Sequence, residues 1–370
     1  MVESWDVLVI GGGMGGVSVA YELAASRSVL LVEAEPMLAQ HTTGRSAAVY
    51  LPTFGGPVVR ALTKASRTRY EEFSAEAQLL TPRVSLWTAT DDAGERHVQR
   101  IITDGGAESV DNARAIELCP VLRPDVLRSA ALDAGTMDID VMALHQIYVR
   151  GLKSRGGVIR TSTPVTGMTR IGSGWQIGIG ADVVHTDLVV NAAGAWTDRL
   201  ARLAGVPTIG LRPLRRTIAI AVGRPVDPAW PLVSDGAEEF YFRPEGPGML
   251  VSPADETLSE PVDAKPDELD VARALDRVNE TTTLALRSVR TAWAGLRSFV
   301  ADRAPVVGTL PGSPGFAFFA GQGGYGIQMA PALAAAAAAI LLGEPVPSDI
   351  AVEPGQLSPT RLMATAPSLG

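Results

Sequence analysis

The sequence predicts an α/β protein in which a Rossmann-like dinucleotide-binding domain is interleaved with a mainly antiparallel β-sheet domain. Three observations predict it: a strand–glycine turn–helix–strand unit at residues 7–33, a second glycine-rich turn after a strand near residue 320, and β-type patterning across residues 211–300. The length of 370 residues suits two domains. We expect residues 1–80, 138–208 and 301–370 to form the dinucleotide-binding domain, and residues 81–137 and 209–300 to form the second.

The first unit begins with an apolar strand at residues 7–10, followed by Gly11, Gly13 and Gly16 in the order G-x-G-x-x-G. The first glycine permits a tight turn, the second lets a pyrophosphate approach the backbone, and the third lets the helix pack closely on the strand. A helix over residues 17–25 would offer its N-terminal N–H groups to phosphates. The second strand, residues 29–32, ends at Glu33, which is suited to accept hydrogen bonds from an adenosine ribose. A glycine-rich turn alone is weak evidence, and the ordered unit is what favours a dinucleotide site.

The middle of the chain is assigned from apolar spacing. Period-3.6 patterns predict helices, and period-2 patterns predict strands. Asp140 is a plausible N-cap for the helix that follows it. The predicted helices cover residues 58–78, 97–107, 112–118 and 141–154, and the predicted strands cover 84–89, 158–161, 165–171, 175–179 and 183–186.

The remaining elements return the chain to the first domain. An apolar strand from residue 188 runs into small residues at 192–194, where a doubly wound sheet exposes backbone to its ligand. A helix at 197–204 follows. In the second domain we expect a strand through residues 216–220, a hairpin at 240–251, a helix at 269–286 and a strand at 291–299. A strand at 316–320, a glycine-rich turn and a helix over 327–342 ending at Gly343 complete the chain.

Composition excludes several classes of function. The net charge of -8 argues against nucleic-acid binding. The longest apolar run, residues 327–342, is too short for an easy membrane span, and no basic leader precedes an apolar segment, so we expect no integral membrane segment and no signal peptide. The four histidines lack metal-ligand spacing, so we expect no metal site. A lone cysteine, Cys119, forms no internal disulfide, which suits a cytoplasmic protein.

Several longer motifs carry a resemblance to a known family. They are HTTGRSAA at 41–48, RALT at 60–63, VNAAGAW at 190–196, LRR at 214–216, FY at 240–241, TAWAGLRSFVAD at 291–302 and QGGYGIQ at 322–328. Together they run almost the length of the chain, and the sequence resembles the FAD-dependent D-amino-acid oxidase superfamily, within it most of all the D-arginine dehydrogenases. The resemblance implies non-covalent FAD, because Cys119 lies in the insert before Pro120 and is poorly placed for flavin attachment.

The resemblance also implies which residues contact FAD. The first glycine turn would hold the pyrophosphate, the acid after the second strand would bind the ribose, and the second glycine turn would direct amides at the pyrimidine end of the flavin. The implied set is Gly11, Gly13, Met14, Gly15, Gly16, Glu33, Ala34, Arg45, Ser46, Ala47, Val165, Ala193, Gly194, Trp196, Gly323, Gly324, Tyr325, Gly326, Ile327 and Gln328.

The implied reaction is oxidative deamination of a D-amino acid, with hydride passing from Cα to flavin N5 and the imine hydrolysing to a 2-keto acid and ammonia. By resemblance, Arg297 grips the substrate α-carboxylate in a bidentate manner, and Tyr241 and Arg216 assist. From the sequence alone, an arginine or tyrosine on a strand is as readily a surface or packing residue. We expect oxygen, a quinone or another compound as the electron acceptor, and the oligomeric state is open.

Three positions depart from the D-arginine dehydrogenases. Val49, Phe54 and Ser85 stand where those enzymes carry a histidine, a tyrosine and a glutamate. A cationic side chain in a closed pocket needs a carboxylate partner. With Leu51 and Trp87 nearby, and Gly324 also at the substrate, these changes favour a neutral or apolar substrate side chain.

Other functions stay open at this point. A sarcosine- or glycine-oxidase-like enzyme that oxidises a secondary amine or cyclic imino acid is the main alternative. An NAD-dependent dehydrogenase would leave the second glycine-rich turn unexplained. A flavin-binding protein without turnover is the third alternative.

Overall fold

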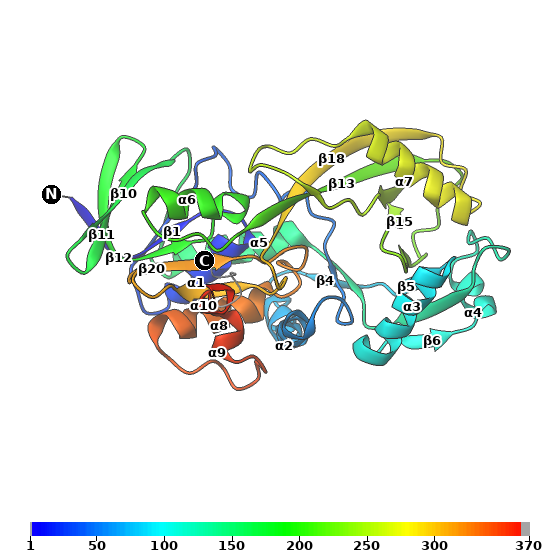
Figure 1. Cartoon of the computed structure of the whole chain (residues 1–370), viewed down its shortest axis with the longest axis horizontal. Coiled ribbons are helices and arrows are strands. Elements are labelled where there is room, and N and C mark those ends of the chain that lie inside the picture. The colour runs from blue at the N-terminus through cyan, green and yellow to red at the C-terminus, as the bar shows by residue number, and fades with distance from the viewer. Residues whose placement is uncertain (1, 364–370) are drawn as a thin grey trace, which may run out of the picture.

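The computed structural model describes residues 2–363, so residue 1 and residues 364–370 of the predicted first domain lie outside the described residues. Two large β-sheets lie side by side along the long axis of the molecule (Figure 1). The chain crosses between them several times, which confirms the predicted interleaved α/β fold. The exact domain boundaries stay a prediction.

The first sheet has eight strands and carries the first glycine turn. β1 (Glu3–Ile10) pairs in parallel with β2 (Val29–Val32) on one side and with β12 (Asp182–Asn191) on the other. The far side of β12 pairs first with β11 and then, beyond residue 188, with β20 (Phe316–Ala320). The sequence predicted two strands here, and the structure has one continuous β12. The remaining strands are β9 (Val158–Arg160), β10 (Val165–Ile171), β11 (Gly174–Ile179) and β19 (Val306–Thr309).

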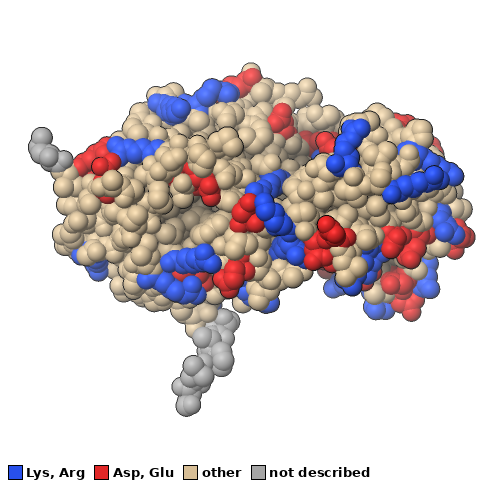
Figure 2. Space-filling model, turned by 90° about the horizontal axis from the view of Figure 1, so that it is seen from above, with Lys and Arg blue, Asp and Glu red and all other residues tan. Residues whose placement is uncertain are grey.

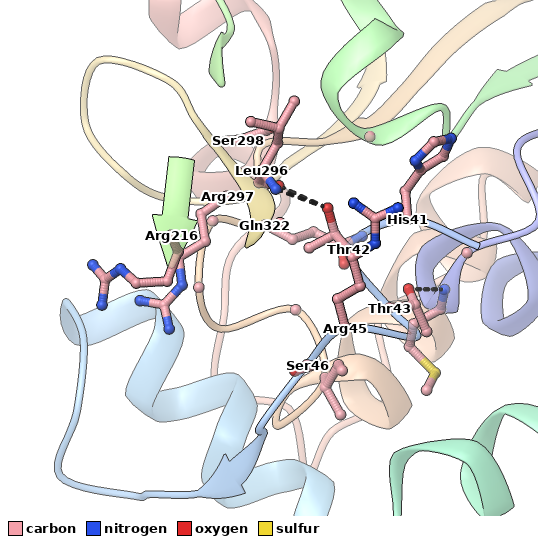
Figure 3. Close-up of a pocket in the computed structure, with 18 of the residues that line it drawn as sticks. His41, Thr42, Thr43, Arg45, Ser46, Arg216, Leu296, Arg297, Ser298 and Gln322 are labelled. Atoms are coloured by element: carbon pink, nitrogen blue, oxygen red, sulfur yellow. Dashed lines mark hydrogen bonds between the residues drawn. The ribbon is translucent and has the colours of Figure 1, made fainter. Parts of the chain in front are cut away.

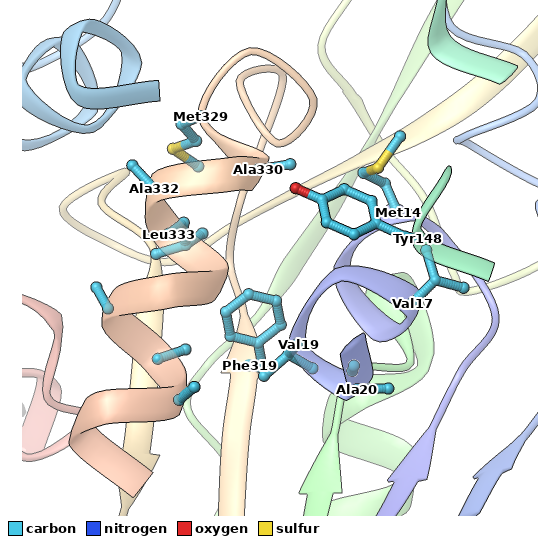
Figure 4. Close-up of a cluster of buried hydrophobic side chains, with 14 of the residues drawn as sticks. Met14, Val17, Val19, Ala20, Tyr148, Phe319, Met329, Ala330, Ala332 and Leu333 are labelled. Carbon is cyan, nitrogen blue, oxygen red and sulfur yellow. The ribbon is translucent and has the colours of Figure 1, made fainter. Parts of the chain in front are cut away.

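Four helices pack together beside this sheet. α1 (Met14–Leu23) contacts both α5 (Val141–Ser154) and α8 (Ala330–Leu342), and α2 (Pro57–Phe73) covers α8. Their small and apolar side chains, including the alanine-rich face of α8, form the largest buried cluster (Figure 4). This cluster fixes the N-terminus of α1 and the turn before α8 relative to each other.

The second sheet has nine strands in the order β17-β13-β16-β15-β14-β5-β7-β6, and β18 adds to β13. α4 (Asn112–Leu118) and α7 (Glu268–Thr281) contribute to the apolar cluster on one face of it. The strands are β5 (Ser85–Ala89), β6 (Glu108–Val110), β7 (Ser129–Asp133), β13 (Arg212–Val222), β14 (Leu232–Asp235), β15 (Tyr241–Glu245), β16 (Gly248–Ser252), β17 (Thr257–Leu258) and β18 (Ser288–Phe299).

A small third sheet joins the two halves. It has the order β3-β8-β4, from β3 (Val49–Tyr50), β4 (Leu80–Pro82) and β8 (Met137–Ile139). The other helical segments are α3 (Asp92–Arg100), η1 (Ile101–Gly105), η2 (Gly194–Trp196), α6 (Thr197–Leu203), α9 (Pro354–Leu357) and α10 (Thr360–Met363). No helix within residues 2–363 is long and apolar enough to cross a membrane.

Local capping explains where helices differ from prediction. The helix predicted at 97–107 begins at Asp92, because the Asp91 side chain accepts the N–H of Gly94 and caps it. Asp140 caps α5 in the same way, as predicted. α8 begins at Ala330 and not at residue 327, because a turn occupies the intervening residues, and its C-cap is Gly343 with φ +72°.

Candidate functional site

One cavity of about 770 Å³ extends between the two large sheets. It begins beside Glu33 and the first glycine turn and reaches the strands of the second sheet that carry Arg216, Tyr241 and Arg297. On the face shown in Figure 2, acidic and basic side chains are interspersed over the surface. The shape suits an elongated ligand with a second, smaller ligand at its end.

Glycine is required by geometry at the first turn. Gly11 has φ +113°, and a Cβ there would lie 2.6 Å from the carbonyl oxygen of Ala192. A Cβ on Gly16 would lie 1.7 Å from the carbonyl oxygen of Gly11. Gly16 does not line the cavity; it allows α1 to pack on β1, as the motif predicts. Gly13 is the N-cap of α1, so the free N–H groups of the first helical turn lie at the cavity.

Two side chains hold this turn in place. The Glu33 carboxylate accepts the N–H of Gly12 at 2.6 Å and the N–H of Glu35 at 2.9 Å, which fixes it at the end of β2. Thr43 Oγ1 accepts the N–H of Met14 at 3.0 Å (Figure 3). The phosphate end of the site is therefore ordered by the protein itself.

The second glycine turn lies directly against the substrate strands. Gly323 has φ +55°, and a Cβ there would lie 2.1 Å from the Phe299 ring. Gln328 Oε1 accepts the N–H of Leu51 at 3.2 Å, while its Nε2 is buried without a partner in the described structure. A buried amide that lacks an acceptor, in a cavity wall, is the kind of group that a polar cofactor edge satisfies.

Most of the predicted cofactor residues line this cavity. Arg45 does so too, but its guanidinium donates to the carbonyl oxygens of Ala264 at 3.1 Å and Ala294 at 3.0 Å, and pairs with Asp263. The predicted residues found in the lining are Gly11, Gly13, Met14, Gly15, Glu33, Ala34, Arg45, Ser46, Ala47, Val165, Ala193, Gly194, Trp196, Gly323, Gly324, Tyr325, Gly326, Ile327 and Gln328.

Arg297 is the free cation at the far end of the cavity. Among residues 2–363 its guanidinium has no hydrogen bond and no ion-pair partner. Burial, and then the neighbouring charge of Arg216, lower the pKa of Arg297 to about 10. Arg297 is half-buried, and an unpaired cation that is partly withdrawn from water favours an anion beside it.

Arg216 lies nearby and is partly used by the protein. Its Nε donates to the carbonyl oxygen of Asp255 at 2.9 Å, and its Nη2 lies 3.4 Å from Glu256. Glu256 in turn forms a two-point pair with Arg303, at 2.7 and 3.0 Å. Figure 3 shows Arg216 and Arg297 extending to the same part of the site.

Tyr241 completes this group. Burial alone would raise the pKa of the Tyr241 phenol, but the charges of Arg297 and Arg216 outweigh it and hold that pKa below its ordinary value. The phenol is therefore polarised as a hydrogen-bond donor.

An apolar wall faces the three polar residues. It includes Val49, Leu51, Phe54 and Trp87. The Phe54 ring lies 5.9 Å from that of Trp87 and 5.2 Å, edge on, from that of Tyr325.

One predicted pocket residue is misplaced. Ser85 is fully buried and does not line the cavity. It lies two residues before Trp87 on β5, and its register partners are Leu232 of β14 and Asp133 of β7.

Sequence reasoning also missed several lining residues. Arg243 lines the cavity on the same strand face as Tyr241, and the period-2 pattern could have identified it. Its charge is offset by Asp138 at 2.6 Å and Glu245 at 2.9 Å. Glu256 and Arg303 come from loops, and no local signal in the sequence marks them.

Comparison with known proteins places these features in context. The chain is 22% identical to glycine oxidase from Bacillus licheniformis over 364 residues, covering 94% of this chain and 96% of that one. It is 25% identical to mitochondrial dimethylglycine dehydrogenase from Rattus norvegicus over 265 residues, but that match covers 67% of this chain and only 30% of the relative, so the chain spans about a third of that protein's length. The structure of glycine oxidase from Geobacillus kaustophilus shares the fold, with a TM-score of 0.83, 20% identity and coverage of 97% and 99%.

The family model for FAD-dependent oxidoreductases of the DAO type matches residues 6–340. That span includes both glycine turns, β12 and all three polar residues of the substrate end. The chain therefore belongs to the DAO family of FAD-dependent oxidoreductases.

Proposed function

We propose that this protein oxidises the Cα–N bond of a D-amino acid with a neutral or apolar side chain, and that its product hydrolyses to a 2-keto acid and ammonia. The observation that carries the proposal is Arg297, an unpartnered, half-buried guanidinium in the same cavity as the dinucleotide cradle. The relatives named glycine oxidase and dimethylglycine dehydrogenase support an amine or amino-acid substrate in general.

The described residues fit FAD at the long arm of the cavity. Glu33 would bind the ribose, and the N-terminus of α1 would bind the pyrophosphate. The turn at Gly323–Gln328 would hold the flavin end, and a polar flavin atom would give Gln328 Nε2 the acceptor that it lacks in the described structure. Bound FAD supplies the acceptor for the hydride that leaves the substrate Cα. We propose that the attachment is non-covalent, since Cys119 is buried in the apolar cluster of the second sheet and does not line the cavity.

The chain's own residues would then orient the substrate. Arg297 would bind the α-carboxylate with two parallel N–H donors, and the Tyr241 phenol would donate a third hydrogen bond. Arg216 would contribute charge, because its remaining N–H groups are not all used by Glu256. With the carboxylate fixed in this way, the substrate turns only about the bond between Cα and the carboxylate carbon to bring Cα to the reacting position. No side chain of the lining is assigned as the base that takes the amine proton.

The apolar wall supports the proposed side-chain preference. Val49, Leu51, Phe54 and Trp87 carry no carboxylate. Two acids elsewhere in the lining already have partners: Glu238 pairs with His97, and Asp235 accepts the N–H of Glu239. Ser85 stands where a D-arginine dehydrogenase would carry a glutamate, and it is outside the lining. For these reasons we do not carry the resemblance to D-arginine dehydrogenases into a proposal for arginine as substrate.

A second candidate is oxidation of a secondary amine or cyclic imino acid, as in the sarcosine- and glycine-oxidase-like enzymes. It needs the same carboxylate receptor, and the near full-length match to a glycine oxidase favours it. In either case the electron acceptor would be oxygen or a quinone.

An anaerobic titration tests the proposal. The purified flavoprotein is mixed with D-amino acids, L-amino acids and N-methyl amino acids, and the absorbance of oxidised flavin is followed. We expect bleaching by apolar D-amino acids and not by D-arginine. Bleaching by secondary amines alone would select the second candidate, and no bleaching by any of them would exclude both.

A further inference from the structure

The open edge of β18 is hydrogen-bonded on either side of Arg297 to two segments that line the proposed FAD site. One is the loop that carries Thr42, and the other is the second glycine turn. In the described structure β18 pairs only with β13, so its other edge has no strand partner. On that edge the N–H of Leu296 donates to Thr42 Oγ1 at 3.2 Å, and its carbonyl oxygen accepts the same hydroxyl at 3.0 Å. A threonine hydroxyl can donate and accept at once, so one side chain replaces a strand partner here.

The next outward-facing residue on this edge is also bonded. The carbonyl oxygen of Ser298 accepts the N–H of Gly323, in the second glycine turn, at 2.9 Å. Arg297 lies between Leu296 and Ser298, so bonds to two cofactor segments flank it. Its guanidinium packs on Gly324 of the same turn.

The residue after Thr42 is Thr43, which bonds to the N-terminus of α1, where the pyrophosphate would bind. Thr43 Oγ1 accepts the N–H of Met14, the first residue of α1 (Figure 3). Two consecutive threonines therefore connect the helix that would bind the pyrophosphate with the strand that carries the carboxylate receptor. Close contact supports this link, because a Cβ on Gly295 would lie 3.5 Å from Cα of Thr42.

We propose that Thr42 is a positioning residue for Arg297, through which an ordered cofactor loop sets the affinity for the substrate carboxylate. This inference rests on the proposed function. Without the hydroxyl, the N–H and carbonyl groups of Leu296, a residue only 5% exposed, lose their partners. The strand edge would shift to regain partners, and the guanidinium of the next residue would move with it.

The test uses the FAD-loaded protein and acetate, a carboxylate that cannot be oxidised there, with binding read from the flavin absorbance change. We expect Thr42→Val to weaken acetate binding roughly tenfold, and Thr42→Ser, which keeps the hydroxyl, to stay within about twofold of wild type. Thr42→Val should also raise KM for the amino acid far more than it lowers kcat, and Thr42→Ser should stay close to wild type in both.

Thr169→Val is the matched control, because Thr169 is exposed on β10 and lies outside the cavity lining. It makes the same threonine-to-valine change, and we expect it to keep both the acetate Kd and the FAD affinity within about twofold of wild type. The inference is wrong if Thr42→Val binds acetate like wild type, if Thr42→Ser loses as much as Thr42→Val, or if Thr169→Val loses acetate affinity equally. Failure of the wild type to bind acetate would instead overturn the proposed function, and this inference with it.

A measurement on the wild type covers the case in which Thr42→Val does not fold. Hydrogen exchange of the segment 294–298 is compared with and without FAD. We expect slower exchange in the FAD-bound protein, since the cofactor orders the loop that bonds to this edge. Equal exchange in the two states would contradict the coupling.

Discussion

The guanidinium of Arg297 packs directly on the backbone of Gly324, so that a Cβ at residue 324 would lie 2.8 Å from Nη1. The second glycine turn therefore packs directly against the Arg297 guanidinium, the proposed carboxylate receptor. It does so without adding a side chain that would compete for the substrate.

Gly324→Ala tests this contact. The added methyl group would push the guanidinium from its position, because the space beneath it is filled. We expect KM for the amino acid to rise at least tenfold at saturating FAD, on the scale of a displaced charged contact. Gly56→Ala is the matched control, since a Cβ there meets nothing within 4 Å. Equal kinetics for Gly324→Ala and wild type would show that the receptor is not held by this turn.

Tyr241 makes the affinity for a carboxylate depend on pH. Because the pKa of its phenol lies below the ordinary value, the phenolate forms within reach of alkaline assays. The phenolate would repel a bound carboxylate and occupy Arg297. We expect the acetate Kd to be level near neutral pH and to rise up to about tenfold per pH unit above the Tyr241 pKa.

Tyr241→Phe should remove the part of that alkaline rise that the phenolate causes, leaving the loss that Arg297 itself causes near its pKa of about 10. It should also weaken binding at neutral pH, because the phenol donor is lost. Acetate titrations of both proteins across the alkaline range provide the measurement. A rise of the same size at the same pH in the phenylalanine variant would assign the titration to another group.

The Phe54 ring limits the space that the apolar wall leaves for the substrate side chain. Phe54→Ala would remove the ring that contacts Trp87 and Tyr325 and leave a space beside the substrate side chain. We expect about tenfold or greater loss of kcat/KM for a large apolar D-amino acid, and a small change for D-alanine. Steady-state kinetics with the two substrates give the ratio. A uniform loss for both would indicate general disorder of the loop and no role in selection.

Asp235 should destabilise the folded protein at neutral pH. Burial raises the pKa of its carboxyl to about 6, although the N–H groups of Glu239 and Ala237 partly oppose this. The group is protonated in both folded and unfolded states at low pH, so the cost is absent there and develops as pH rises from the unfolded pKa, near 4, through 6. We expect Asp235→Asn to stabilise the protein by roughly 2 kcal/mol at pH 8, with the gain vanishing towards pH 4. Chemical denaturation at several pH values measures this, and a gain independent of pH would contradict it.

Much of the fold follows from the sequence because its cofactor unit is local. Gly11, Gly16 and Glu33 act within one strand–helix–strand unit, where spacing alone fixes geometry. Helix caps such as Asp140 are local in the same sense. The period-2 pattern likewise puts Arg216 and Arg297 on strands of the second domain, although their pairing as β13 and β18 comes only from the structure.

The missed features depend on contacts distant in sequence. Ser85 has the alternation of a pocket residue, yet it is fully buried and lies outside the cavity lining. Glu256 and Arg303 meet across 47 residues, and Thr42 reaches Leu296 across 254. Such pairs are set by how the two sheets dock, which no local pattern encodes.

The most direct test of the central claim is to compare an amino acid with its decarboxylated amine. D-Leucine and isopentylamine are each mixed anaerobically with the wild-type protein and with Arg297→Met, and the flavin absorbance is followed. We predict saturable bleaching only for D-leucine with wild type, and a loss of at least a hundredfold in its bimolecular rate with Arg297→Met. Equal bleaching by the amine, or by D-leucine with both proteins, would show that Arg297 does not capture a substrate carboxylate.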